Sequence, residues 1–256
     1  MGWLLIILSL TVLWIASLCK VLFAPSKASF LDNGHCFIKK NVLLVIAHPD
    51  DESMFFSPTI NYLIARGHNL HILCLSVGNA DGMGNLRKNE LYQACAVLKV
   101  LLEKVRTLDH PDLQDGFGKV WNHSLVAKII EEEISGAGID VIITFDQYGV
   151  SGHCNHRDVH YGVCKYFHDT SRRDIEAWEL VSTSLFRKYI GPIDIWLSNF
   201  YSKRIPERLT HCIVNEHPKK SFHAMAQHSS QWVWFRKLFI SLSSYTYVNT
   251  LRKIDK

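Results

Sequence analysis

The run Asn41-Val42-Leu43-Leu44-Val45-Ile46-Ala47 is apolar after its first residue and is followed directly by His48-Pro49-Asp50-Asp51-Glu52. Continuous apolar runs rich in β-branched residues are typical of strands that are buried on both faces of a parallel sheet. In sheets of this kind, functional sites form just beyond the carboxyl ends of the strands. This stretch therefore predicts an α/β fold and the position of one half of a site.

Strands and helices alternate along the following chain, and no internal repeat is present. The predicted elements are a helix up to residue 66, a strand over 70–77, a helix from about residue 85 with Leu98 and Leu101 on its apolar face, a strand over 105–108, a helix over 119–134 that includes Trp121, and a strand over 139–145. This alternation predicts a three-layer, Rossmann-like α/β fold with a mostly parallel sheet.

The composition excludes several classes of protein. Apolar residues make up 48% of the 256 residues and charged residues 20%, which is ordinary for a globular protein and unlike a disordered or fibrous one. The net charge of +4 is too small to indicate a nucleic-acid partner, although residues 203–256 are basic enough to meet an anionic surface. Seven cysteines without a C-x-x-C pair indicate reduced thiols in a cytosol-facing domain.

The N-terminus carries an uncharged segment from Trp3 to Cys19, which is at the short end of what spans a bilayer. The first lysines of the chain, beginning with Lys20, all follow this segment, and that order places the next domain in the cytosol. A cleaved signal peptide is the alternative, but no positive charge precedes the segment. The predicted organisation is a transmembrane helix as anchor over 1–24, a linker over 25–40 and a catalytic domain over 41–256.

Ionisable residues crowd the segment after the first strand, where His48, Asp50, Asp51 and Glu52 lie together. Adjacent carboxylates repel unless a positive charge holds them, and His and Asp are both zinc ligands. Neighbouring residues in extended geometry point to opposite sides, so one Asp can bind a metal while the other faces a water molecule. Acidic residues also favour helix N-termini, but that alternative does not account for His48.

A second cluster follows the strand over 139–145, where His153, His156 and His160 lie within eight residues. His153 and His156 stand at a predicted loop-to-helix junction, whereas His156 and His160 are spaced to share a helix face, which zinc sites also use. A solvent-exposed histidine-rich turn is the alternative. The topology brings both clusters to one sheet edge. Three ligands with an open position are typical of catalytic zinc, which predicts a hydrolase.

Together, A-H-P-D-D-E after the first strand and the later S-G-H-x-N-H resemble the motifs of the LmbE-like zinc de-N-acetylases, most closely those of the eukaryotic branch. The resemblance covers about residues 40–235. It implies a metal, Zn²⁺ or another divalent ion, with the ligands His48, Asp51 and His156. It also implies Asp50 as general base, His153 as the residue that stabilises the oxyanion or helps proton transfer, and Arg87 as a substrate contact.

The resemblance further implies the reaction and its place. The family branch removes the acetyl group from N-acetylglucosaminyl-phosphatidylinositol, giving glucosaminyl-phosphatidylinositol and acetate in GPI-anchor biosynthesis. The implied partners are this glycolipid substrate and the endoplasmic reticulum membrane, with the catalytic domain facing the cytosol; no protein partner is implied. Two alternatives stay open: a deacetylase of a soluble N-acetylglucosamine conjugate, and a membrane-tethered phosphoinositide-binding adaptor without catalysis.

Three segments depart from this account or add to it. Most bacterial members have H-P-D-H where this chain has H-C-N-H at residues 153–156, which keeps the two histidines and loses the intervening Asp. The element at residues 228–231, H-S-S-Q, resembles a late family element, and its role is not predicted.

Residues 232–240 place aromatic side chains beside Arg236 and Lys237, as in a helix that rests on lipid headgroups; a core-packed terminal helix is the alternative.

Overall fold

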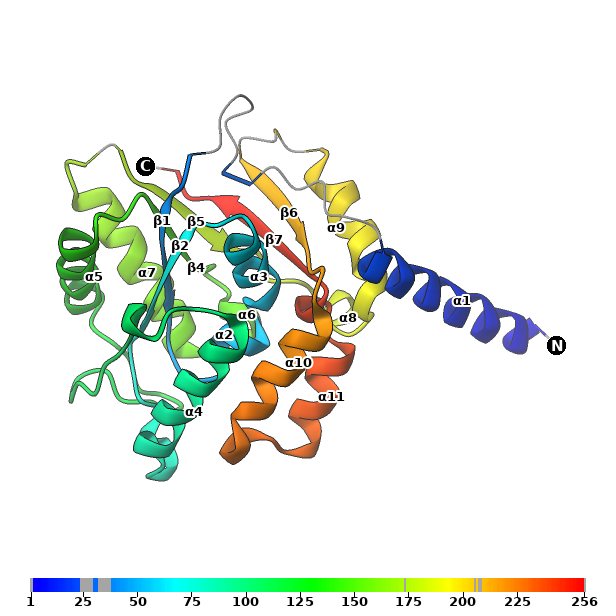
Figure 1. Cartoon of the computed structure of the whole chain (residues 1–256), viewed down its shortest axis with the longest axis horizontal. Coiled ribbons are helices and arrows are strands. Elements are labelled where there is room, and N and C mark those ends of the chain that lie inside the picture. Colours follow the sequence, from blue (N-terminus) through cyan, green and yellow to red (C-terminus); the bar gives the residue numbers. More distant parts are fainter. Residues whose placement is uncertain are drawn as a thin grey trace.

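The computed structural model describes residues 2–23, 30–31, 38–172, 174–204, 206 and 209–255 (Figure 1). Its elements are, in order, α1 (Gly2–Phe23), β1 (Asn41–Ile46), α2 (Asp51–Met54), α3 (Ser57–Ala65), β2 (Asn69–Cys74), η1 (Asn79–Asp81), α4 (Gly84–Leu98), η2 (Leu102–Lys104), β3 (Val105–Thr107), α5 (His123–Ala137), β4 (Val141–Phe145), α6 (Gly149–Gly152), α7 (Cys154–Asp169), β5 (Glu176–Leu180), α8 (Leu185–Lys188), η3 (Gly191–Ile193), α9 (Asp194–Ser202), β6 (Thr210–Val214), α10 (Pro218–Gln227), η4 (Ser229–Gln231), α11 (Trp234–Leu242), η5 (Ser244–Thr246) and β7 (Val248–Lys253). Most of the predicted linker over 25–40 lies outside the described residues.

The strands of the described chain form one sheet in the order β3-β2-β1-β4-β5-β7-β6. Strands β1 to β5 pair in parallel, and β7 runs antiparallel to both of its neighbours, so the prediction of a mostly parallel sheet is confirmed. Because β1 pairs with β2 on one side and β4 on the other, the chain leaves the carboxyl end of β1 at a topological switch point. α/β proteins bind ligands in the crevice at such a point.

Helices cover both faces of the sheet, with α5 and α7 on one face and α3, α4 and α10 on the other (Figure 1). Two predicted helix limits are wrong. Trp121 precedes α5, because the side chain of Asn122 caps the helix by accepting the backbone N–H groups of its first turn. Leu101 follows α4 and is exposed, because Lys99 adopts the left-handed conformation that ends the helix.

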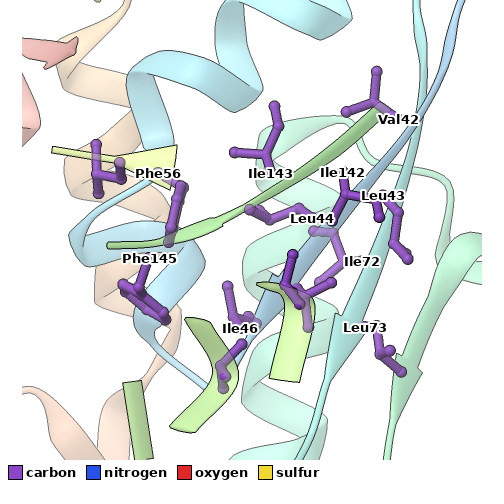
Figure 2. Packing of buried hydrophobic residues seen from close by; sticks show 14 of the residues in the cluster. Val42, Leu43, Leu44, Ile46, Phe56, Ile72, Leu73, Ile142, Ile143 and Phe145 are labelled. Atoms are coloured by element: carbon purple, nitrogen blue, oxygen red, sulfur yellow. The ribbon is translucent and has the colours of Figure 1, made fainter. Parts of the chain in front are cut away.

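The core is built around β1. Figure 2 shows apolar side chains from both faces of β1 packed among those of β2 and β4; the labelled side chains on these three strands are Val42, Leu43, Leu44, Ile46, Ile72, Leu73, Ile142, Ile143 and Phe145. None of these side chains is more than 1% exposed. Burying each one stabilises the fold by about 2 kcal/mol, so the carboxyl ends of β1 and β4 are held rigidly beside each other.

The last strand, β7, also holds the segment that follows β1. Asn249 lies fully buried in β7, and its Oδ1 accepts hydrogen bonds from the backbone N–H and the hydroxyl of Thr59 at 3.2 and 2.7 Å. The Nδ2 atom of Asn249 donates to the carbonyl of Phe55 at 2.9 Å. The end of the chain therefore secures α2 and α3, which follow the predicted metal-binding turn.

The N-terminal helix α1 has 22 residues and is the candidate membrane span among the described residues. Only 11% of its apolar window is buried, which is unlike the core helix of a soluble protein. Its C-terminal part contacts the domain, because Trp196 Nε1 donates to Ser17 Oγ at 3.0 Å and Val21 packs against Ile195. Its N-terminal part projects away from the domain (Figure 1).

Candidate active site

The turn after β1 fixes Asp51 through the backbone. The N–H groups of Ala47 and His48 donate to Oδ2 of Asp51 at 3.0 and 2.8 Å, and Oδ1 lies 3.1 Å from Nε2 of His156. Burial alone would raise the pKa of Asp51, but the His156 imidazole and the hydrogen bonds from His48 hold that pKa well below its ordinary value. Asp51 is therefore an ionised carboxylate with a fixed orientation toward His156.

Asp50 has partners different from those of Asp51, as their adjacent positions predict. Its backbone φ is +121°, a conformation that non-glycine residues rarely adopt, and its N–H donates to Oε2 of Glu52 at 3.1 Å. Burial raises the pKa of Asp50, and the nearby guanidinium groups of Arg236 and Arg87 oppose that rise only in part. A buried carboxylate with a raised pKa is well suited to accept a proton.

His153 and His156 lie at the start of α7, where the chain returns to the sheet edge after β4. His153 is the N-cap residue of α7. The Nδ1–H of His156 donates to the carbonyl of Gly149 at 3.2 Å, because a carbonyl can only accept, and Nε2 faces Asp51. The His156 ring stacks on Phe145 with ring centres 4.1 Å apart. The two predicted clusters thus meet at one edge of the sheet.

These side chains fit a metal ion. The ligand atoms of His48, His153 and His156 lie within 4.8 Å of one another. Nδ1 of His153 is buried without a hydrogen-bond partner, and the 3.1 Å between Asp51 Oδ1 and His156 Nε2 is close to the roughly 3.3 Å between two ligands of one tetrahedral zinc ion. The site therefore offers two overlapping ligand sets, one with Asp51 and one with His153 beside His48 and His156.

His153 is neutral at physiological pH. Burial and the neighbouring imidazoles of His156 and His48 lower its pKa to about 4. Its ring centre lies 4.8 Å from the ring centres of both His48 and His156. A neutral imidazole in this place can bind a metal or donate a hydrogen bond to a bound molecule, so the geometry accommodates either role.

Asp115 belongs to the site and was missed by the sequence analysis. It lies in the loop after β3, with Oδ1 3.1 Å from Nε2 of His48 and Oδ2 3.1 Å from Nη1 of Arg87. Burial would raise the pKa of Asp115, but the hydrogen bond with His48 and the charge of Arg87 lower it to about 2. Its position after a parallel strand could have indicated a site residue, but Asp109 and Asp112 follow the same strand, so this position does not single out Asp115.

Arg87 joins the loops that follow β1 and β2. Its Nη2 donates to the carbonyl of Pro49 and its Nη1 to that of Gly78, both at 2.9 Å, and Nη2 lies 3.6 Å from Oδ2 of Asp50. Gly78 has φ +70°, and a Cβ there would lie 2.5 Å from the guanidinium carbon, so glycine is required for this close approach. All of these partners are protein groups, and the predicted contact of Arg87 with substrate stays a prediction.

Arg236 reaches the site from α11. Its Nη1 donates to Oδ2 of Asp50 at 2.5 Å and to Oε1 of Gln231 at 2.6 Å. The interpretation that placed Arg236 with Lys237 on a headgroup-facing helix surface is wrong for Arg236, because the fold turns this side chain inward onto the segment after β1. Lys237, the next residue, is exposed. No local pattern distinguishes the two cations.

His160 lies outside the cluster although it shares α7 with His156. Its Nδ1 is 3.0 Å from the carbonyl of Phe145 and 3.4 Å from Oε2 of Glu179, so the ring faces β4 and β5. His156 and His160 have the spacing of four residues that zinc sites use, but strands β4 and β5 fill the space beside His160. The geometry therefore favours His153 or Asp51, rather than His160, as a metal ligand beside His156.

The element at residues 228–231 closes the site from the C-terminal half of the chain. Nε2 of His228 lies 2.7 Å from Oε1 of Glu52, and both side chains are fully buried. The two serines that follow bind the carboxylate of Glu90 through both hydroxyls and one backbone N–H. The element therefore connects the turn after β1, helix α4 and Arg236 through hydrogen bonds. The sequence alone did not predict this structural role.

We expect His228→Ala to lower the free energy of unfolding by about 3 kcal/mol, because the Glu52 carboxylate would stay buried without the imidazole that balances its charge. Burial lowers the pKa of His228, but Glu52 raises it further, so the net shift is upward. The pair therefore stabilises the fold fully below the ordinary histidine pKa, and its contribution is lost as the pH rises through the raised pKa. Urea unfolding of the detergent-solubilised protein at several pH values measures both effects.

The control for this prediction is His223→Ala, because His223 lies exposed on α10. Its loss should change the free energy of unfolding by less than about 0.5 kcal/mol at any pH. Equal effects of the two substitutions, or a His228→Ala effect that grows as the pH rises, would contradict an ionised pair with Glu52.

Comparisons with known proteins agree with this geometry. Residues 43–167, which include both clusters of candidate metal ligands, match the family described as PIG-L: GlcNAc-PI de-N-acetylase. A relative from Dictyostelium discoideum, named probable N-acetylglucosaminyl-phosphatidylinositol de-N-acetylase, is 34% identical over 249 residues, which cover 87% of this chain and 96% of the relative. A relative from Bos taurus named N-acetylglucosaminyl-phosphatidylinositol de-N-acetylase is 33% identical over 94% of this chain and 92% of its own length.

Solved structures of deacetylases have the same fold. The N,N'-diacetylchitobiose deacetylase from Pyrococcus horikoshii superposes with a TM-score of 0.63 at 14% identity, over 93% of this chain and 90% of its own. The A40926 pseudoaglycone deacetylase Dbv21 superposes with a TM-score of 0.59 at 13% identity, over 84% and 97% of the two chains. At these identities the likeness concerns the arrangement of strands and helices.

Proposed function

The chain belongs to the GlcNAc-PI de-N-acetylase family, and on that basis we propose that it hydrolyses the acetamide of N-acetylglucosaminyl-phosphatidylinositol in GPI-anchor biosynthesis. The products are glucosaminyl-phosphatidylinositol and acetate. The observation that carries this proposal is the buried carboxylate of Asp50 beside a cluster of imidazoles that can hold a metal ion. Amide hydrolysis needs both a proton acceptor and a group that polarises the carbonyl.

We propose Zn²⁺ as the metal, with His48, Asp51 and His156 as its ligands. When bound, such an ion lowers the pKa of a water molecule and polarises the acetyl carbonyl. This ligand set is supported by the hydrogen bonds that two of its side chains form with the protein backbone. His156 donates its other ring N–H to a carbonyl, and Asp51 accepts two backbone N–H groups, so both are oriented before any ion arrives.

Asp50 moves the proton in this mechanism. It accepts a proton from the attacking water as the new C–O bond forms at the acetyl carbon. When the C–N bond breaks, it returns that proton to the leaving amine of the sugar. Arg236 and Arg87 hold the carboxylate in one position for both transfers, because each places a guanidinium group near Oδ2 of Asp50. His153, neutral at pH 7, donates a hydrogen bond to the oxyanion that develops on the acetyl oxygen.

The direct test is release of acetate from N-acetylglucosaminyl-phosphatidylinositol by the purified full chain, with and without a chelator. We expect acetate and free amine in equal amounts, loss of activity with the chelator, and recovery when Zn²⁺ is added. Equal kcat/KM for a soluble N-acetylglucosamine conjugate without lipid would favour a soluble substrate. Phosphoinositide binding without acetate release would favour a non-catalytic adaptor.

We infer that α1 anchors the chain in the endoplasmic reticulum membrane, with the domain in the cytosol. Lys20 lies in the last turn of the helix, Lys39 and Lys40 follow it, and the packing of Ser17 and Val21 on the domain supports a helix that stays attached. Protease added to sealed microsomes should digest the domain. Protection of the domain until the membrane is permeabilised would place it in the lumen.

We expect Arg236→Ala to lower kcat by about tenfold to a hundredfold while the bound metal stays, because Asp50 would lose the guanidinium group that orients it. Metal content and acetate release in detergent should be measured on the same preparation. The matched control is Lys237→Ala, whose side chain is exposed on the same helix. Equal kcat values for the two variants would show that Arg236 has no part in the reaction.

A further inference from the structure

The contacts of α1 restrict how deeply the domain lies in a membrane. Trp14 is the first residue of α1 with a described contact to the domain, since its Nε1 lies 3.0 Å from where a Cβ on Gly191 would stand. Ser17 accepts a hydrogen bond from Trp196, the Lys20 ammonium lies 3.6 Å from the centre of the Trp196 ring, and Val21 is buried. The helix is therefore packed on the domain from residue 14 onward.

The free part of α1 is too short to cross a bilayer. At 1.5 Å per residue the whole helix is about 33 Å long, but residues 2–13 cover only about 18 Å. The hydrocarbon core of a bilayer is about 30 Å thick. If α1 spans that core, residues 14–21 must supply the remaining distance of about 12 Å. The domain surface that packs on them then lies at the depth of the lipid acyl chains.

That surface carries the apolar side chains which such a depth requires. Helices α8 and α9 flank the base of α1 (Figure 1), and α11 joins them because the Tyr189 ring at the end of α8 contacts that of Phe239 in α11. Large apolar side chains on these three helices are at least half exposed; they include Leu185, Phe186, Phe200, Trp234, Phe235 and Leu238. A soluble protein rarely exposes this many large apolar side chains on neighbouring helices.

The patch is rigid and has a cationic border. Arg187 of α8 forms an ion pair with Asp194 of α9 at 2.7 Å, so the two helices are tied together. At the end of α9, Lys203 and Arg204 are exposed, and the Arg204 guanidinium lies 4.1 Å from the centre of the Phe200 ring. Aromatic side chains below cations are typical of segments that lie at the boundary between acyl chains and phosphate headgroups.

We propose that α8, α9 and α11 form a platform that embeds in the lipid leaflet on the domain's side of the membrane, around the base of α1. The occupant of this surface is lipid, because α9 packs directly on α1, and residues 3–19 of α1 carry no charge. The opposite side of α11 carries Arg236, which contacts Asp50. The candidate active site is therefore separated from the lipid by a single helix.

The test uses the full chain reconstituted into phosphatidylcholine vesicles that carry a photoactivatable carbene precursor on an acyl chain. After illumination, mass spectrometry locates the labelled residues. We expect label in α1 and, at about tenfold above background, in peptides from residues 185–201 and 232–242. The internal control is the peptide with Leu101 and Leu102, which are 56% and 48% exposed but lie at the β3 edge of the sheet, opposite β6.

A double variant separates lipid contact from incidental reactivity. Phe200→Glu with Trp234→Glu should remove label from α9 and α11 and leave the label in α1 unchanged, since both side chains point outward and support no core packing. Label confined to α1, with the platform peptides at the level of the Leu101 control, would overturn the proposal. That result would show that the patch does not contact the lipid acyl chains.

Discussion

Asp50→Asn is expected to keep its bound metal and to lower kcat by about a hundredfold or more, because an amide oxygen does not accept a proton from water. The substitution is conservative in every other respect. Asn has the size of Asp, accepts the hydrogen bond from Arg236, and adopts positive φ about as readily, so the turn with φ +121° persists. The change therefore isolates the proton acceptor from the structure that surrounds it.

Elemental analysis and acetate release on the same Asp50→Asn sample decide the outcome. The control is Asp112→Asn, because the Asp112 side chain is 73% exposed in the loop that supplies Asp115. It should change neither metal content nor kcat. Loss of metal from Asp50→Asn would make Asp50 a ligand, and unchanged kcat would remove it from the mechanism.

His156→Ala is expected to abolish metal binding and activity together, with kcat/KM reduced by about a thousandfold or more, because two remaining ligands hold a metal ion poorly. The ring has one described polar contact besides Asp51, the carbonyl of Gly149. His160→Ala is the matched control on the same helix, because it removes an equal side chain that faces Phe145 and Glu179 instead. That variant should retain its metal.

The two overlapping ligand sets are separated by a second pair of variants. Asp51→Asn is preferable to Asp51→Ala, because the amide oxygen still accepts the backbone N–H groups of Ala47 and His48. We expect Asp51→Asn to lose metal and His153→Ala to retain it with a lowered kcat. The reverse result would replace Asp51 by His153 in the ligand set and leave the oxyanion without its proposed donor.

The fold could be predicted because its strongest signals are local. The apolar run of β1 and that of β4 each show burial on both faces, and the order of strands and helices restricts the topology to a few choices. The limits of α4 and α5 were wrong because they depend on single conformations, the left-handed Lys99 and the capping Asn122. Apolar periodicity carries no information about either.

The candidate site was predictable where one short segment supplies several groups. The motifs around Asp50 and His156 are contiguous, and the parallel sheet brings their ends together. Asp115 and Arg236 come from a long loop and from a helix near the chain end, and neither has a local pattern that distinguishes it from neighbouring charges. Arg236 even resembled a headgroup-facing cation, because its helix has one side toward the site and another toward the exterior.

The antiparallel strand β7 also has a consequence for synthesis on the ribosome. It lies between β5 and β6, and its Asn249 secures α2 and α3, so contacts between the two ends of the catalytic domain complete the sheet. During translation β6 has no strand to pair with until β7 has been made, and Asp50 contacts Arg236 only after most of the chain has been made. A stop codon after residue 247 would spare every proposed catalytic residue and still prevent the domain from folding.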